Sequence, residues 1–107
     1  MNKYNNKKTF VDGICFDSKG EAQRYSELLL LQKAKEISDL KCQVKFEIIP
    51  KNGKEQAAYY IADFYYIENG KEIVEDYKSK VTKTPAYILK RKLFKLHYPD
   101  YVFKEVY

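Results

Sequence analysis

Two aspartates and a lysine occupy positions from which they could hold a divalent metal ion. Asp63 and Asp76 stand on either side of Asn69-Gly70, a dipeptide that favours a two-residue hairpin turn between runs of β-prone residues. Counted outward from that turn, Asp63 falls directly opposite Asp76, and Lys78 projects on the same face as Asp76. Two carboxylates and one ammonium around a small volume suit a hard divalent cation.

The alternative interpretation of this cluster is a surface ion-pair network, in which Lys78 and its lysine neighbours neutralise the two acids. That alternative explains less well why like charges oppose each other in a sheet, an arrangement that is destabilising without a cation. The two acids stand amid residues such as Ile61, Tyr65 and Val74, where an apolar pair would cost nothing. We therefore favour a metal site.

The role of a third carboxylate, Glu21, is left open by the sequence. Glu21 occupies the third helical position behind Ser18, where a capping box would use it. The same helical periodicity places it at the edge that should face the sheet, from which it could supply a further metal ligand. Glu75 points to the strand face opposite Asp76, so we prefer a structural role for it.

Two helices and several strands must position these groups. We expect a small hairpin over residues 9–16, a helix from Ser18 to about residue 36, a strand over residues 43–49, the central hairpin, a second helix opened by Thr84-Pro85 and a last strand over residues 101–107. The first helix should face the sheet with one arc, comprising Glu21, Tyr25, Leu28, Leu29 and Gln32. The second should pack through an apolar stripe, comprising Ala86, Leu89, Leu93 and Leu96.

This order of elements predicts an α+β fold with an α-β-β-β-α-β core, in which a central mixed sheet is flanked by helices and preceded by a small hairpin. The 107 residues are expected to form a single domain, with residues 1–8 as a mobile basic arm. No apolar run reaches membrane-spanning length, and two cysteines fit neither a disulfide framework nor a zinc site. We expect a cytoplasmic protein.

Twenty basic residues against fifteen acidic ones give a net charge of +5, which suits a polyanionic partner. Basic and hydroxyl side chains follow the acidic cluster in the connecting loop and on the second helix, where they could bind phosphate without reading sequence. They are Lys80, Thr82, Lys83, Lys90, Arg91, Lys92 and Lys95. We expect Arg91, Lys92 and Lys95 to lie away from the apolar stripe and Lys90 at its edge.

The chain resembles the PD-(D/E)XK nuclease superfamily. The resemblance rests on Asp63 in one strand, Asp76-Tyr77-Lys78 in the next as the (D/E)XK element, and an upstream helix carrying Glu21. Ala62 stands where the nominal motif has proline. Further segments resemble small phage-encoded Holliday junction resolvase-like endonucleases: Phe16-Asp17-Ser18-Lys19, Ala62-Asp63-Phe64, Glu75-Asp76-Tyr77-Lys78 and Leu89-Lys90-Arg91-Lys92-Leu93.

The resemblance implies a restriction-endonuclease-like fold and phosphodiester hydrolysis with Mg²⁺ or Mn²⁺. It implies that Asp63 and Asp76 are metal ligands, with the Tyr77 carbonyl and Glu21 as further ones. It also implies that Lys78 orients or activates the attacking water and stabilises the charge that develops on the phosphate. A structure-selective DNA endonuclease of phage origin follows, and cutting two strands symmetrically would require a homodimer. Two alternatives stay open: a non-catalytic nucleic-acid-binding module, and a module that binds a host protein through a tyrosine-rich surface.

Overall fold

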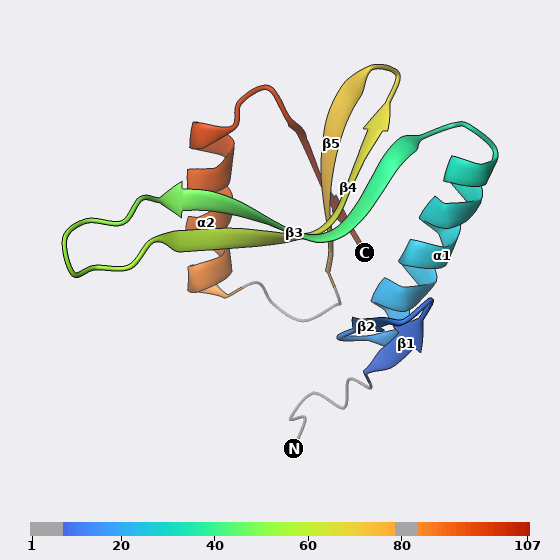
Figure 1. The fold of residues 1–107 in the computed structure, drawn as a ribbon, viewed down its shortest axis with the longest axis horizontal. Helices are drawn as coiled ribbons and strands as arrows, with labels where there is room; N and C mark the ends of the chain where they lie inside the picture. The colour runs from blue at the N-terminus through green and yellow to red at the C-terminus, as the bar shows by residue number, and fades with distance from the viewer. Residues whose placement is uncertain (1–7, 79–83) are drawn as a thin grey trace.

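The computed structural model describes residues 8–78 and 84–107, and shows two helices, a four-stranded sheet and a small separate hairpin (Figure 1). The elements follow the predicted order, which confirms the α+β fold. They are β1 (Thr9–Val11), β2 (Ile14–Phe16), α1 (Lys19–Lys33), β3 (Ser38–Ile49), β4 (Ala58–Glu68), β5 (Lys71–Tyr77), α2 (Pro85–His97) and β6 (Val102–Val106). None of the described helices is long and apolar enough to cross a membrane.

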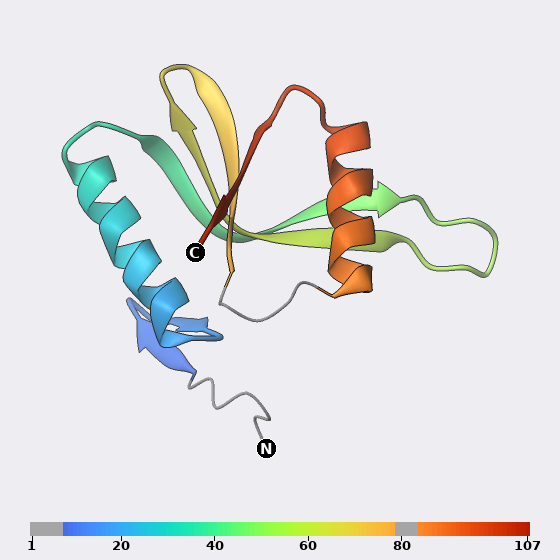
Figure 2. The same cartoon turned by 180° about the vertical axis from the view of Figure 1, so that it is seen from behind.

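The sheet is mixed and has the strand order β3-β4-β5-β6. Its first three strands are antiparallel, and β6 returns after α2 to pair in parallel with β5, as the view from behind shows (Figure 2). The β4–β5 hairpin has the predicted register, with Glu68 opposite Lys71 and Tyr65 opposite Val74. Asn69 and Gly70 both adopt positive φ, as a type I′ turn requires. The turn therefore fixes which residues share a face.

Each helix covers its own hydrophobic cluster. The α1 cluster has Phe16, Leu28, Phe64 and Tyr66 at its centre, and the α2 cluster has Phe46, Tyr60, Ala62 and Phe94. On β5, Ile73 belongs to the first cluster and Val74 to the second, so the helices lie against opposite faces of this strand.

The strand β4 passes from one cluster to the other. Ala62 is buried under α2 and Phe64 is buried with α1, and Asp63 is the residue between them. The acidic cluster predicted from the sequence therefore lies where the two halves of the core meet.

Two element boundaries differ from the prediction. The helix α1 ends at Lys33, three residues before the predicted end, because Lys35 adopts a positive φ that ends the helix. The strand β3 begins at Ser38, five residues earlier than expected. Asp39 and Gln43 also have positive φ. These irregularities interrupt the alternation of apolar and polar residues, so the alternation from Gln43 onward did not reveal the earlier part of the strand.

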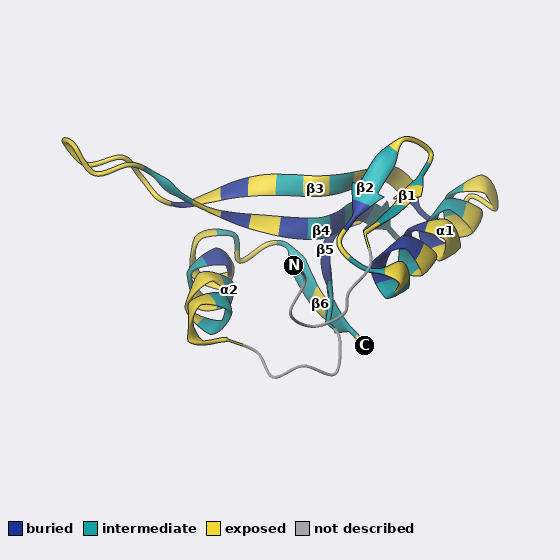
Figure 3. Ribbon diagram, turned by 90° about the horizontal axis from the view of Figure 1, so that it is seen from below, coloured by how far each residue is buried: buried dark blue, intermediate teal, exposed yellow. Residues whose placement is uncertain are grey.

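The predicted packing face of α2 is wrong. Leu89 and Leu96 are 58% and 70% exposed, Ala86 is exposed, and Leu93 is half-buried. The helix packs instead through Phe94, whose ring contacts Phe46, Tyr60, Tyr98, Tyr101 and Phe103. Aromatic side chains bury more area than leucines and pack edge to face, so they determine the orientation of the helix. Figure 3 shows the exposed outer surface of α2.

Candidate metal centre

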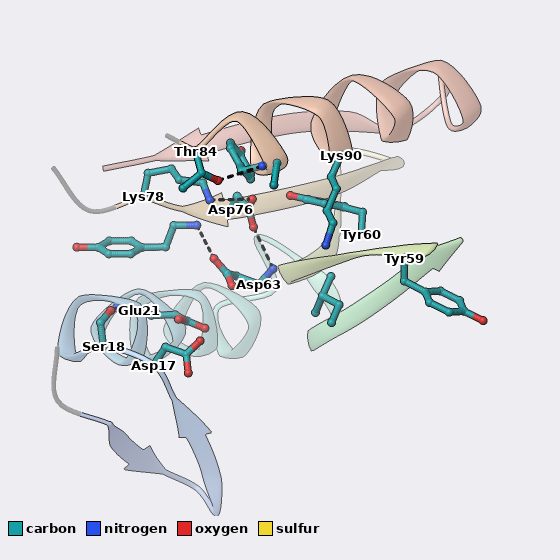
Figure 4. Close-up of a pocket in the computed structure, with 14 residues that line it drawn as sticks. Asp17, Ser18, Glu21, Tyr59, Tyr60, Asp63, Asp76, Lys78, Thr84 and Lys90 are labelled. Carbon is teal, nitrogen blue, oxygen red and sulfur yellow. Dashed lines mark hydrogen bonds and ion pairs between the residues drawn. The ribbon is translucent and has the colours of Figure 1, made fainter. Parts of the chain in front are cut away.

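Asp63 and Asp76 face each other across the β4–β5 pair (Figure 4). The backbone N–H of Tyr77 donates to Asp63 Oδ2 at 2.8 Å, and the backbone N–H of Asp63 approaches Asp76 Oδ1 at 3.4 Å. Each carboxylate is thus held by the backbone of the opposite strand. Because the last regular pair of this ladder is Phe64 with Glu75, these N–H groups are available to the side chains.

Lys78 lies beside Asp76, as the hairpin register predicts. Its Nζ is 3.3 Å from Asp76 Oδ2 and 3.5 Å from the centroid of the Tyr87 ring. The Tyr87 hydroxyl donates to the Glu105 carboxylate, which also accepts from Arg91 Nη1 at 2.9 Å. The ammonium is therefore held between a carboxylate and an aromatic face that is itself fixed by hydrogen bonds.

The structure places Glu21 both at the helix cap and in the wall of the acidic pocket, and the cap bond uses its backbone N–H and not its carboxylate. Its backbone N–H donates to Ser18 Oγ at 3.1 Å, as a helix cap does. Its side chain is buried and lines the same pocket of about 460 Å³ as the two aspartates. Asp17, the residue before the cap, lines this pocket as well. The sequence analysis did not assign Asp17 to the site, although it stands in one of the segments that carry the family resemblance.

The carboxylates strongly perturb one another. Burial, followed by the charges of Asp76 and Glu21, raises the pKa of Asp63 to about 8. Burial, followed by the charge of Asp17, raises the pKa of Glu21 to about 7. Near neutral pH the protein alone cannot hold all of these groups fully ionised without cost, and a cation would remove that cost.

The donor set fits a hard metal ion. Magnesium commonly takes one or two protein carboxylates and completes its shell with water and phosphate oxygens, so Asp63 and Asp76 would be sufficient protein ligands. Glu21 and the Tyr77 carbonyl are the further oxygen donors that the family resemblance implies. Among residues 8–78 and 84–107, no group of three or more acidic, histidine or cysteine side chains is arranged so that it could hold a metal ion, so the fit rests on the pair Asp63 and Asp76.

A family model described as Protein of unknown function (DUF1064) matches residues 1–106. The chain belongs to this family. No curated protein and no solved structure matches it. The matched range contains the four carboxylates and Lys78, so the whole candidate site lies within the DUF1064 region.

Glu75 faces away from the candidate metal centre of this DUF1064 protein, as the strand alternation predicts. It is fully buried and receives two hydrogen bonds from Arg24, from Nε at 2.7 Å and from Nη2 at 2.8 Å. Tyr66 Oη donates to it at 2.7 Å. The sequence analysis did not find this network, because Arg24 is 51 residues away in the chain. The adjacent acids of β5 therefore point in different directions: Glu75 is held inside the core by Arg24 and Tyr66, and Asp76 lines the pocket.

The predicted phosphate-binding residues divide into three groups. Lys80, Thr82 and Lys83 lie outside the described residues. Lys90 and Lys92 are exposed, and Lys90 lines the acidic pocket. The exposed Lys95 places its Nζ 5.0 Å from the centroid of the Phe103 ring. Arg91 does not lie away from the packed face as predicted. It is half-buried and paired with Glu105, because the helix is rotated from the expected orientation.

We expect the metal-free protein to lose thermal stability as the pH rises from 5 to 8.5. Over this range the unfolded carboxylates are already ionised, whereas Asp63 and Glu21 still hold protons in the folded state, so the folded state binds more protons. Stability then falls with rising pH, and Tm should drop by at least about 5 °C for a domain of this size. Mg²⁺ should raise Tm more at pH 8 than at pH 5, since it binds ionised carboxylates.

Differential scanning fluorimetry in EDTA and in Mg²⁺ measures this effect. Asp63→Asn is the matched variant, because it removes the group with the higher pKa while keeping an oxygen that can accept from Tyr77. Its Tm should depend less on pH than that of the wild type. A wild-type Tm that is constant between pH 5 and 8.5 in EDTA would contradict the electrostatic coupling described above.

Proposed function

We propose that this DUF1064 protein is a metal-dependent DNA endonuclease that hydrolyses phosphodiester bonds with Mg²⁺ or Mn²⁺. The observation that carries the proposal is the convergence of Asp63 and Asp76, from neighbouring strands, with Lys78 at 3.3 Å from one of them. Glu21 joins them from a helix that is distant in sequence. The family resemblance seen in the sequence supports the same reaction.

In this proposal Asp63 and Asp76 hold the metal ion, with Glu21 and the Tyr77 carbonyl as further ligands. A bound ion would polarise the phosphate and lower the pKa of its water. Lys78 would orient the attacking water and stabilise the charge that develops on the phosphate. Its contacts with Asp76 and the Tyr87 ring hold the ammonium in place before substrate binds.

DNA would reach this site over the basic surface of α2. Lys90 and Lys92 are exposed there, and the net charge of +5 favours a polyanion. We propose that the substrate is branched or junction DNA in the cytoplasm of a bacterial host, within the DNA metabolism of a phage or prophage. Symmetric cutting of two strands would use a homodimer, since one chain has one such centre among its described residues.

A second candidate function is a module that binds another protein. It is favoured by the exposure of Leu89 and Leu96 on the outer face of α2, because a partner could cover these two large apolar side chains. This candidate does not account for the buried carboxylates beside Lys78, so we rank it second.

The test is cleavage of labelled DNA by the purified full-length chain. A four-way junction and a linear duplex of matched sequence are incubated with Mg²⁺, with Mn²⁺ or with EDTA. We expect cut products with either metal and none in EDTA, with the junction cut faster than the duplex. If neither substrate is cut in Mg²⁺ or Mn²⁺, the endonuclease proposal is wrong and the protein-binding candidate becomes the better one. Equal cutting in EDTA would exclude the metal-dependent mechanism.

A further inference from the structure

Tyr60 on β4 has a buried hydroxyl that nothing in the described chain satisfies. The residue is 3% exposed, and its ring packs 5.2 Å from the Phe94 ring and 6.2 Å from the Phe103 ring. Its Oη is the one buried side-chain polar atom within residues 8–78 and 84–107 without a hydrogen-bond partner. Burying such a group without a partner costs stability, so its retention calls for an explanation.

Tyr60 is one of the residues that form the wall of the acidic pocket. Tyr60 lines this pocket together with Asp76, and Figure 4 shows its hydroxyl directed toward Asp76. Asp76 Oδ2 is engaged by Lys78, and its Oδ1 is approached by the backbone N–H of Asp63. Asp76 is close enough to act on this hydroxyl, because burial and then the charge of Asp76 raise the pKa of Tyr60. No hydrogen bond of acceptable geometry joins the two groups, so the Tyr60 hydroxyl faces the site as a donor whose bond the described residues do not complete.

Tyr66, on the same strand, is a natural comparison. It is also buried, but its hydroxyl donates to Glu75 at 2.7 Å inside the core. Two buried tyrosines on β4 thus differ in one respect: one hydroxyl is satisfied by the protein, and the other is directed at the pocket.

Lys90 supplies a second donor to the same pocket. It projects from α2 and lines the pocket together with Tyr60 (Figure 4). Its side chain is exposed, so a ligand can reach the ammonium. A carboxylate group binds metal, whereas the ammonium beside it can only donate, and the hydroxyl has a proton available to donate to the same acceptor. The acceptor that belongs beside a nuclease metal is an anionic phosphate oxygen.

We propose that the Tyr60 hydroxyl and the Lys90 ammonium form a binding subsite for a non-bridging phosphate oxygen of the DNA, on the α2 side of Asp76. This inference rests on the proposed endonuclease function and adds its substrate contact. The Tyr60 donor is fixed in advance by ring packing, so it needs no reorganisation when charge develops on the phosphate. Lys90 adds charge from a flexible side chain.

The first part of the test is thermal stability without ligand. Tyr60→Phe keeps the packed ring and removes a hydroxyl that has no partner, so its Tm should equal or exceed that of the wild type. Tyr66→Phe is the matched control and should lower Tm, since it leaves Glu75 without one of its donors. A Tm loss in Tyr60→Phe as large as that in Tyr66→Phe would overturn the inference, because the hydroxyl would then have an internal partner such as Asp76.

The second part measures the substrate contact. Cleavage of the four-way junction in Mg²⁺ should slow by about 100-fold in kcat for Tyr60→Phe, the typical loss of one fixed donor to a developing oxyanion. Lys90→Gln should weaken binding of labelled junction in Ca²⁺ by about fivefold and leave binding in EDTA less affected. Lys71→Gln is the charge-matched control, because Lys71 is exposed at the β4–β5 turn and does not line the pocket.

The outcomes separate this inference from the endonuclease proposal. If the wild type cleaves DNA and Tyr60→Phe cleaves at the same rate, the phosphate subsite is wrong and the endonuclease proposal stands. If the wild type neither binds nor cleaves DNA, the endonuclease proposal fails, and with it the assignment of the hydroxyl to phosphate, whatever the Tm values. Slow cleavage by Tyr60→Phe with an unreduced Tm supports the subsite.

Discussion

Replacing Asp76 by Asn is expected to abolish Mg²⁺-dependent cleavage of DNA while leaving DNA binding intact or improved. The change removes a proposed metal ligand and a negative charge that repels phosphate. It retains an oxygen at Oδ1, so the contact with the backbone N–H of Asp63 can persist. The rate should fall by more than about 1,000-fold, as for the loss of an essential catalytic group. Single-turnover cleavage of the labelled junction measures this loss, and fluorescence anisotropy measures binding.

Asp100→Asn is the control for this variant. Asp100 is an exposed aspartate after α2 and does not line the pocket, so the same change of charge should leave cleavage unaltered. The Asp76→Asn protein should also be at least as stable as the wild type in EDTA, because the repulsion with Asp63 is removed. Wild-type cleavage by Asp76→Asn would exclude Asp76 as a metal ligand.

Replacing Arg24 by Met is expected to lower the free energy of unfolding by about 3–5 kcal/mol, the usual cost of leaving a buried charge without its partner. Glu75 is fully buried and would lose both hydrogen bonds from the guanidinium. Tyr66 would remain as its donor, and one neutral donor does not compensate a buried carboxylate. Urea denaturation followed by circular dichroism measures the change.

The double variant Arg24→Met with Glu75→Leu distinguishes a lost charge partner from lost packing. Replacing a buried ion pair by apolar side chains is often nearly neutral. The double variant should therefore be more stable than Arg24→Met alone. If the two proteins unfold at the same urea concentration, the cost lies in packing around α1 and the ion-pair explanation is incorrect.

The parts of the site that the sequence predicted depend on local geometry. Asn69-Gly70 specifies a two-residue turn, and the alternation of strand residues then determines that Asp76 and Lys78 share a face while Glu75 does not. The cap at Ser18 likewise involves residues three positions apart. Such relations span a few residues and a fixed period, so they can be read without knowledge of the rest of the fold.

The parts that were missed depend on contacts between distant segments. Helical periodicity identifies apolar and aromatic faces of α2 but does not say which one packs, and the aromatic cluster around Phe94 decides it. Arg24 reaches Glu75 across 51 residues. The sequence of β4 suggests that Tyr60 is an ordinary core tyrosine, and only the structure shows that its hydroxyl lacks a hydrogen-bond partner in the described part of the chain and that the residue lines the pocket. These three features require the packed structure.

The position of Asp63 between the two hydrophobic clusters links the packing of both halves of the core to one proposed metal ligand. A cavity made under α2 would shift Ala62, and a cavity made under α1 would shift Phe64, because close-packed interiors transmit strain. Either shift would displace Asp63, which lies between these two residues. If the proposed activity is present, its rate should then respond to substitutions in either half of the core, including ones at residues that do not line the pocket. A change in the packing under one helix would then alter the site that the other helix also shapes.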